Sequence, residues 1–313
     1  MQLRPENYSY DVDEVLGSVV GIRTLVPEDA FTAATLGTER AGNGVLIRRD
    51  GLVLTIGYLV TEAQTIWLSL RDGRVVQGHV LGYDQETGFG LVQALARLDM
   101  PAVTLGNSKL AKTGDAVVMG GAGGRDSSVA ARIVAKQEFA GYWEYLLDEA
   151  IFTAPSHPHW GGAPLIGAKG ELLGIGSLQL QQSSDGGRAE NINMIVPIDL
   201  LKPILDDLLS FGRAQKPPRP WLGLYAAELG KRVVIAGLSD HGPAKKADLR
   251  AGDIVLAIDG VEVTDLAGFF RQIWSLGPAG TAFVLLVHRK GRTLEMRITS
   301  ADRTSFLKGP VLH

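Results

Sequence analysis

Residues 242–255 read GPAKKADLRAGDIV, and residues 258–261 read IDGV. The apolar run Ile254–Ile258 predicts a strand, and the Asp259-Gly260 pair favours a tight turn directly after it. Other elements are expected on both sides of this stretch: strands at Arg232–Ala236, Ala282–Val287 and Thr293–Ile298, and one helix at Leu266–Leu276. The stretch therefore belongs to a small α/β module, residues 221–302.

A short segment rich in proline precedes this module. Residues 213–220 read RAQKPPRP, with three prolines and three basic residues, which is typical of a stiff, solvated linker. Before the linker, residues 199–210 carry apolar side chains at helical spacing. They predict a helix with Pro203 in its first turn and Gly212 as its stop signal.

The rest of the chain, residues 13–212, predicts two blocks of short strands. Asp50-Gly51 and Asp72-Gly73 mark turns between apolar segments. The expected strands of the first block are Gly44–Ile47, Leu52–Thr55, Ile66–Leu70 and Val75–Leu81; those of the second are Ala116–Met119, Val129–Ala135, Ala150–Thr153, Leu172–Ser177 and Met194–Pro197.

The composition excludes several classes of protein. The 313 residues include 39 glycines and no cysteine, which rules out a disulfide scaffold and a thiol nucleophile. Lys and Arg number 31 against 34 Asp and Glu, a balance that argues against a dedicated nucleic-acid binder. No apolar run reaches the ~20 residues of a membrane span, and the N-terminal residues lack the apolar region of a secretory signal. We therefore expect no membrane insertion, and a cytoplasmic location, or a periplasmic one if a signal was trimmed.

The order of these signals resembles the HtrA/Deg group of chymotrypsin-like serine proteases, followed by one PDZ domain. The segments GNGV at residues 42–45 and LGNS at residues 105–108 match motifs of that group, and the likeness extends from about Asp13 to Ser300. The resemblance implies a mainly β fold: a chymotrypsin-like double β-barrel followed by a small α/β PDZ domain.

The three catalytic positions of the group depart from its pattern. Residues 54–60 read LTIGYLV, so Tyr58 stands in place of the catalytic histidine. Residues 84–92 read DQETGFGLV, with Gly88 in place of aspartate. Residues 159–165 read HWGGAPL, with Gly161 in place of the serine nucleophile and His159 and Trp160 on the oxyanion loop.

These substitutions remove the parts that acyl transfer needs: a nucleophile, a base and an anion to orient the base. Gly161 has no side chain, and a tyrosine phenol with a pKa near ~10 is a poor general base at neutral pH. An oxyanion hole of backbone N–H groups could survive, but it gives little without a nucleophile. The barrels are therefore expected to form a pseudoprotease.

Two other chemistries remain open on the same loop. Ser156 beside His157 could form a substitute dyad, and His157 with His159 could contribute to a zinc site. The alternative is that these are loop residues on a solvated turn. The interpretation favoured by the sequence is that the chain has neither a metal site nor a cofactor.

The C-terminal signature resembles that of PDZ domains, except that Asp248 replaces a glycine. In that family a peptide adds to the edge of a sheet, and a loop binds its terminal carboxylate. The loop here is Trp221-Leu222-Gly223-Leu224, and the amides of Leu222, Gly223 and Leu224 would bind the carboxylate. Phe270 and Ile273 of the predicted helix are expected to line the groove, while Phe269 and Trp274 are better explained as core.

The favoured function is a non-catalytic adaptor that binds protein C-termini or extended peptides through its PDZ domain. The alternatives are an active endopeptidase with a non-standard site, and an oligomerising modulator of an active protease relative. By analogy with the group, a homotrimer is expected. The aromatic cluster at residues 142–145 could form a contact patch, although packing within the barrel is favoured.

Overall fold

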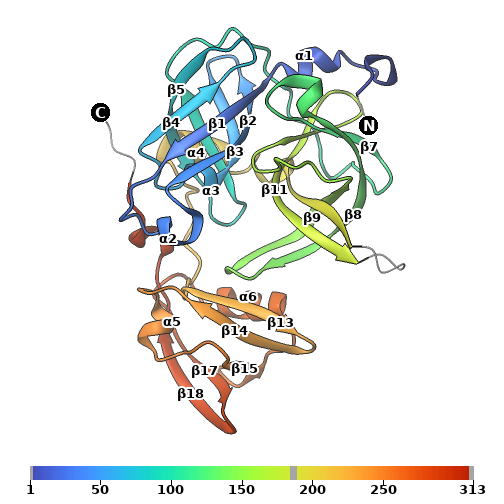
Figure 1. Cartoon of the computed structure of the whole chain (residues 1–313). Helices are drawn as coiled ribbons and strands as arrows, with labels where there is room; N and C mark the ends of the chain where they lie inside the picture. The colour runs from blue at the N-terminus through green and yellow to red at the C-terminus, as the bar shows by residue number, and fades with distance from the viewer. Residues whose placement is uncertain (1–2, 184–188, 310–313) are drawn as a thin grey trace. The chain divides into compact units, whose positions relative to one another are not determined.

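Two closed antiparallel barrels are built from residues 19–197 (Figure 1). The structure, a computed structural model, describes residues 3–183 and 189–309. The first barrel has the strand order β1-β2-β3-β6-β5-β4. Its strands are β1 (Val19–Leu25), β2 (Glu39–Arg48), β3 (Leu52–Ile56), β4 (Thr65–Ser69), β5 (Val75–Tyr83) and β6 (Phe89–Ala94).

The second barrel closes in the same way, in the order β10-β11-β12-β9-β8-β7. Its strands are β7 (Ala116–Met119), β8 (Val129–Gly141), β9 (Tyr145–Ala154), β10 (Pro164–Ile166), β11 (Leu172–Ser183) and β12 (Ala189–Pro197). Inward-facing side chains such as Ile133, Ile151 and Leu165 form its core. Closure leaves neither barrel with an open strand edge. The predicted mainly β double barrel is confirmed.

The helices of this region are short. They are η1 (Pro5–Asn7), α1 (Val12–Leu16), α2 (Ala33–Leu36), α3 (Gly57–Val60), η2 (Gly124–Ser127), η3 (Ile198–Leu200) and α4 (Leu205–Phe211). The predicted helix over residues 199–210 is wrong in its first half, because the regular helix begins only after Pro203, whose ring and missing N–H interrupt it. The predicted stop is correct: Gly212 caps α4 with φ +71°.

A single open sheet forms the C-terminal module. Its order is β13-β14-β15-β17-β18, with β16 paired to β15. The strands are β13 (Leu224–Leu229), β14 (Arg232–Leu238), β15 (Ile254–Ile258), β16 (Val261–Glu262), β17 (Ala282–Arg289) and β18 (Arg292–Thr299); the helices are α5 (Pro243–Lys246), α6 (Leu266–Ser275) and η4 (Arg303–Phe306). The core of the module packs α6 on the sheet through Phe269, Phe270 and Ile273. Unlike the barrels, this sheet has β13 as an edge strand.

The described chain divides into two compact units. The second unit contains Lys216–Leu307 together with Glu138–Asp148, the tip of the hairpin formed by β8 and β9. We call Glu138–Asp148 the hairpin tip. The first unit holds the remaining described residues, both barrels included.

Candidate functional site

Tyr58 and Gly161 come together in the first unit. Helix α3 follows β3 without a loop and carries Tyr58, whose hydroxyl donates a hydrogen bond to the Ser177 carbonyl at 3.0 Å. A Cβ built on Gly161 would lie 2.7 Å from that hydroxyl oxygen. The phenol therefore fills the space that a side chain at position 161 would need.

The Tyr58 phenol is held in its neutral form. Burial raises its pKa well above the usual value of 10, and a hydrogen bond with the Trp160 side chain offsets only part of this effect. A phenol with a raised pKa does not take up the proton of a nucleophile at neutral pH.

Gly88 lies beside the start of α3. Its carbonyl accepts a hydrogen bond from the Gly57 amide at 2.6 Å, and its own amide donates to the Asp84 carbonyl at 2.8 Å. The Asp84 carboxylate accepts from the Thr87 amide at 2.8 Å and so caps its own turn. Gly88 has φ +85°, a left-handed conformation that glycine adopts without strain. Backbone alone therefore fills this position.

The loop before β10 is fixed to strand β2. The Asn43 amide donates to the Gly161 carbonyl at 2.7 Å, and the Asn43 side chain donates to the His159 carbonyl at 2.7 Å. Gly162 has φ +74°, and a Cβ there would lie 1.8 Å from the Asn43 carbonyl oxygen. Only glycine fits at position 162, so the backbone of this loop is closely constrained.

His157 is buried, with 1% of its surface exposed, so its interpretation as part of a solvated turn is wrong. Its Nε2 bonds the Ser127 carbonyl at 2.6 Å, and its Nδ1 accepts from the His159 amide at 3.0 Å. A carbonyl can only accept, so the ring is neutral with its proton on Nε2. Burial lowers the pKa of His157, in agreement with this state.

These bonds leave His157 no free nitrogen for other chemistry. Ser156 Oγ accepts a hydrogen bond from the Gln179 side chain at 3.0 Å rather than bonding the ring, so the suggested dyad is not formed. Within residues 3–183 and 189–309, no group of three or more His, Cys, Asp or Glu side chains could hold a metal ion. The His159 amide, on the proposed oxyanion loop, already donates to His157.

The backbone of the carboxylate loop in the second unit is constrained by close contacts between glycines. Gly223 has φ +72°, and a Cβ there would lie 2.8 Å from the Cα of Gly242. Two hydrogen bonds fix the loop carbonyls: the Ala244 amide to Leu222 at 2.8 Å, and the Ser239 amide to Gly223 at 2.7 Å. The signature at residues 242–255 therefore positions the loop amides, while Trp221 pairs with Ala301 through two backbone hydrogen bonds of 3.0 Å.

The amides of Leu222, Gly223 and Leu224 all point at the carboxylate of Glu144. Glu144 Oε1 accepts from these amides at 3.2, 2.8 and 3.1 Å, and Oε2 accepts from Leu222 at 2.9 Å. Glu144 is 8% exposed. Its burial raises the pKa to about 7, although the four N–H contacts and the charge of Arg303 act in the opposite direction.

Beside this carboxylate, the main chain of the hairpin tip forms a hydrogen bond with the edge strand β13. The Ala226 amide of β13 donates to the Tyr142 carbonyl at 2.8 Å, and the rings of Tyr142 and Tyr225 lie 5.9 Å apart. The favoured interpretation of the aromatic cluster as barrel packing is therefore wrong for Tyr142, which contacts β13 through its carbonyl and its ring.

Helix α6 forms the other side of this region. Phe270 and Ile273, expected along the groove, are fully buried in the module core, and so is Phe269. Trp274, expected in the core, is only partly buried: it stacks on Phe270 at 5.6 Å, and the Arg219 guanidinium lies over its ring. Arg271 is paired with Glu138 at 2.5 Å and with Asp148 at 2.6 Å, one at each end of the hairpin tip.

Sequence reasoning missed Glu144, Tyr142, Ala226 and Arg271 as members of this site. An acidic residue inside an aromatic turn is the one signal that the sequence offers. It does not identify a partner 78 residues further along the chain.

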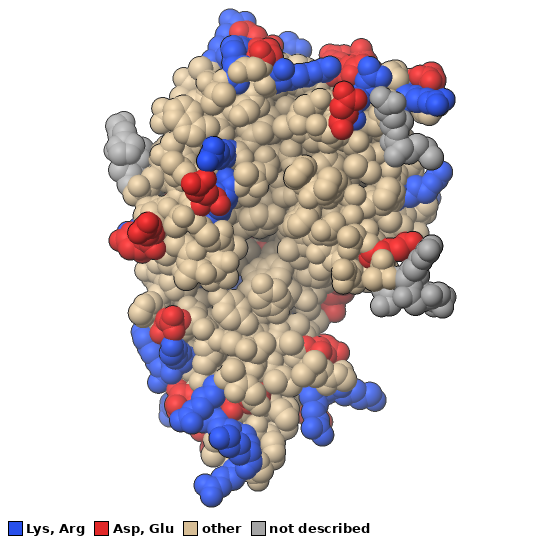
Figure 2. Space-filling model, viewed as in Figure 1, with Lys and Arg blue, Asp and Glu red and all other residues tan. Residues whose placement is uncertain are grey.

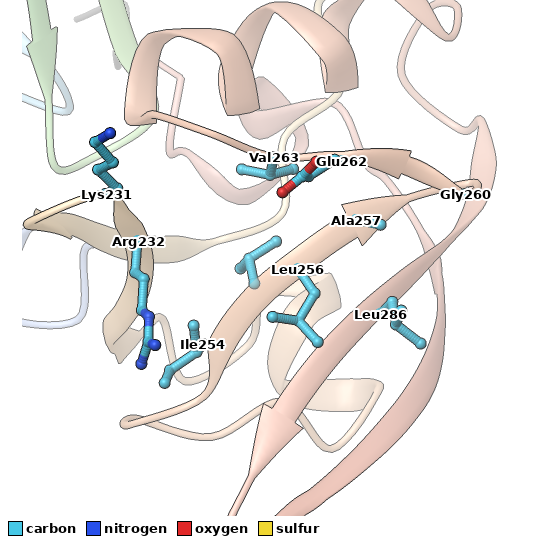
Figure 3. Close-up of a pocket in the computed structure, with 10 residues that line it drawn as sticks. Lys231, Arg232, Ile254, Leu256, Ala257, Gly260, Glu262, Val263 and Leu286 are labelled. Atoms are coloured by element: carbon cyan, nitrogen blue, oxygen red, sulfur yellow. The ribbon is translucent and has the colours of Figure 1, made fainter.

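A separate hollow lies on the module, away from these residues (Figure 3). Lys231 and Arg232 border it on one side and Glu262 on another, and Ile254 and Leu256 lie in its wall. It holds no nucleophile next to a base among its lining residues.

The charged side chains are mixed in sign. On the face that Figure 2 shows, Lys and Arg gather together with Asp and Glu in small groups, with wide uncharged areas between them. This face does not present the basic stripe of a nucleic-acid binder. Within the described residues, no helix has the length and apolar character needed to cross a membrane.

Two family descriptions match the chain in succession. Residues 42–175 match a trypsin-like peptidase domain, and residues 220–299 match a PDZ domain. The chain is 28% identical over 281 residues to a probable periplasmic serine endoprotease DegP-like of Halomonas elongata, covering 86% of this chain and 58% of that protein. It is 24% identical over 276 residues to the serine endoprotease DegS of Escherichia coli, covering 82% and 76%. The chain thus spans little more than half the length of the DegP-like relatives.

Solved structures show the same fold. The HtrA-type protease AlgW with a decapeptide matches 96% of this chain and 98% of its own, at 22% identity and a TM-score of 0.54. A serine endoprotease from Yersinia pestis matches 93% and 96%, at 20% identity and a TM-score of 0.53. With a trypsin-like peptidase domain followed by a PDZ domain, and with DegP-like and DegS relatives over most of its length, the chain has the domain order of the HtrA family and is similar to its members.

Proposed function

We propose that this chain is a non-catalytic member of the HtrA family that binds protein C-termini, or extended peptides, through its PDZ groove. The observation that carries the proposal is the convergence of three loop amides, from Leu222, Gly223 and Leu224, on one carboxylate. Such a set of N–H donors suits the terminal carboxylate of a peptide, and the edge strand β13 suits main-chain pairing.

The absence of catalysis is part of the same proposal. Gly161 offers no nucleophile, the Tyr58 hydroxyl fills the space beside it, and the position of Gly88 holds only backbone. These three positions supply no attacking group, no base of suitable pKa and no orienting anion, so they cannot catalyse the hydrolysis of a peptide bond by the serine-protease mechanism.

Binding is tested with the full chain and fluorescent decapeptide libraries. One library has free C-terminal carboxylates and the other has amidated ends. The proposal expects saturable binding of the free acids and little binding of the amides. Equal binding of both libraries, or of neither, would contradict it.

A second candidate, an active endopeptidase, is favoured by the names of the curated relatives, which are serine endoproteases. Turnover of casein or a fluorogenic peptide by the purified chain distinguishes the two. Our proposal expects none above background. Turnover that disappears in Ser156→Ala would establish the second candidate instead.

Location and assembly are proposed from the relatives. A periplasmic location follows from the relatives that are named periplasmic. Self-association, as a trimer by analogy with the family, and assembly with an active protease relative are both checked by light scattering and by co-purification from native cells.

A further inference from the structure

The hairpin tip occupies the peptide groove of its own PDZ domain at three places. Its carboxylate lies in the loop, its main chain pairs with the edge strand, and its ends are bound to the opposite helix. All three sets of contacts lie within the second unit. They come from a segment that is 78 residues away from the loop in sequence.

The first contact occupies all three amides of residues 222–224 in the carboxylate loop. The three amides of residues 222–224 make four contacts with Glu144, all between 2.8 and 3.2 Å. Hydrogen bonds from N–H groups to a carboxylate are among the stronger ones in proteins. The same donors cannot serve a second carboxylate at the same time, so a peptide end and Glu144 exclude each other.

The second contact reproduces strand addition. Tyr142, two residues before Glu144, accepts the Ala226 amide at 2.8 Å. A strand repeats every two residues, so a carboxylate in the loop and a carbonyl two residues earlier are the pattern expected of a bound peptide. The Tyr142 ring lies against Tyr225, a neighbour of Ala226 on the same strand.

The third contact fixes the ends of the tip to α6. Arg271 bridges Glu138 and Asp148, and Ala140 packs against the module core. The Arg271, Glu138 and Asp148 side chains are 47%, 43% and 88% exposed. Exposed ion pairs contribute little stability, so this contact orients the tip without making it permanent.

We propose that the hairpin tip is a built-in ligand of the PDZ groove, with the Glu144 carboxylate in the place of a peptide's terminal carboxylate, so that external peptides bind only by displacing it. The proposal rests on the proposed function and names its regulation. A groove that is open in only a fraction of molecules shows an affinity reduced by that fraction.

Two substitutions remove the Glu144 carboxylate in different ways. Glu144→Gly deletes the side chain and relieves the backbone, since Glu144 has φ +60°. Glu144→Gln keeps the shape, but its NH2 group cannot accept the hydrogen bond that Oε2 accepts from the Leu222 amide at 2.9 Å. The matched control is Glu149→Gln, which removes a carboxylate from strand β9, outside the tip, where Glu149 pairs with Lys136 at 2.8 Å.

The test measures groove opening and peptide binding separately in the full chain. Hydrogen exchange of residues 222–226 is expected to be at least tenfold faster in Glu144→Gly and Glu144→Gln than in the wild type and Glu149→Gln. Binding of the free-acid decapeptide library is expected to be at least tenfold tighter in the same two variants.

The outcomes separate this inference from the proposed function. Faster exchange in the Glu144 variants without binding of any decapeptide keeps the built-in ligand and removes the peptide-binding role. Unchanged exchange in Glu144→Gly, or equal peptide affinity in the wild type and the Glu144 variants, overturns the built-in ligand whatever the wild type binds.

Discussion

The hydroxyl oxygen of Tyr58 lies 2.7 Å from the point where a Cβ on Gly161 would stand. The two residues are therefore coupled by volume, since a larger residue at one position requires a smaller one at the other. The phenol also donates to the Ser177 carbonyl at 3.0 Å, which holds it in this place.

Gly161→Ala is expected to destabilise the wild type by about 1–3 kcal/mol through overpacking. In a Tyr58→Phe background the cost should be smaller, because the nearest ring carbon would lie 3.6 Å away, an ordinary contact. Urea unfolding of the four proteins gives the coupling free energy. Gly309→Ala serves as the control, because a Cβ at Gly309 would meet no atom within 4 Å. Additive effects of Tyr58→Phe and Gly161→Ala would contradict the volume argument.

Much of the fold could be predicted from the sequence. Asp-Gly turns and apolar alternation predict most of the strands. The segment at residues 242–255 predicts the C-terminal module, and its Ala244 amide bonds the Leu222 carbonyl of the carboxylate loop. The sequence does not show where the helix before Gly212 begins, because a proline is tolerated in a first helical turn. The structure forms only 3-10 and turn conformations until Leu205.

The candidate site was only partly predictable. Motif spacing suggests a carboxylate loop at residues 221–224, but it cannot show that Glu144 lies in that loop. Pairing between distant segments depends on tertiary packing, which no local pattern encodes. The burial of His157 was missed for the same reason: a His-Pro-His segment resembles an exposed turn until Ser127 and His159 are placed around the ring.

The triple variant Tyr58→His, Gly88→Asp, Gly161→Ser is expected to show no turnover above background. The amide of His159 would still donate to His157, and an aspartate at position 88 would adopt φ +85°, which strains most side chains. Hydrolysis of a fluorogenic peptide library is the measurement. Turnover that is lost when Gly161→Ser is left out of the set would contradict this expectation.

His157→Phe is expected to destabilise the first unit by about 1–3 kcal/mol, because it leaves the Ser127 carbonyl and the His159 amide without their buried partner. The pKa of His157 is lowered in the fold. Its contribution to stability is therefore complete above the ordinary value of 6.5 and is lost as the pH falls below it. Thermal unfolding between pH 5 and 8 should show a steeper loss on the acid side for the wild type. Parallel curves for the two proteins would argue against a neutral His157.

Asp253→Ala is expected to destabilise the PDZ domain by about 3–5 kcal/mol, since it leaves the guanidinium of Arg289 without its buried partner. The Asp253 side chain is 1% exposed and accepts two hydrogen bonds of 2.6 Å from Arg289. Asp253→Ala with Arg289→Met should recover part of the loss. Chemical unfolding followed by tryptophan fluorescence measures it, and no recovery in the double variant would exclude a paired role.

The pH dependence of peptide binding follows from the state of Glu144. Burial raises its pKa to about 7 in the groove, against 4.5 ordinarily, with Arg303 and the loop amides acting in the opposite direction. Arg271, which pairs with Glu138 and Asp148 of the tip, stays charged in this range, because these two carboxylates raise its pKa. A raised pKa means that docking of the tip is most stable below pH 4.5 and weakens as the pH rises to about 7.

Peptide affinity in the wild type is therefore expected to increase between pH 5 and 7.5, by at least tenfold, since each pKa unit corresponds to about tenfold. The terminal carboxylate of the probe stays ionised over this range, because α-carboxyl groups have pKa values of about 3.3–3.7. Anisotropy titrations with one free-acid decapeptide that has no titratable side chain are the measurement. Glu144→Gln has no carboxylate to titrate, so its affinity should be constant, while Glu149→Gln should follow the wild type. A wild-type affinity that does not vary with pH, or one that varies equally in Glu144→Gln, would show that Glu144 does not compete for the loop.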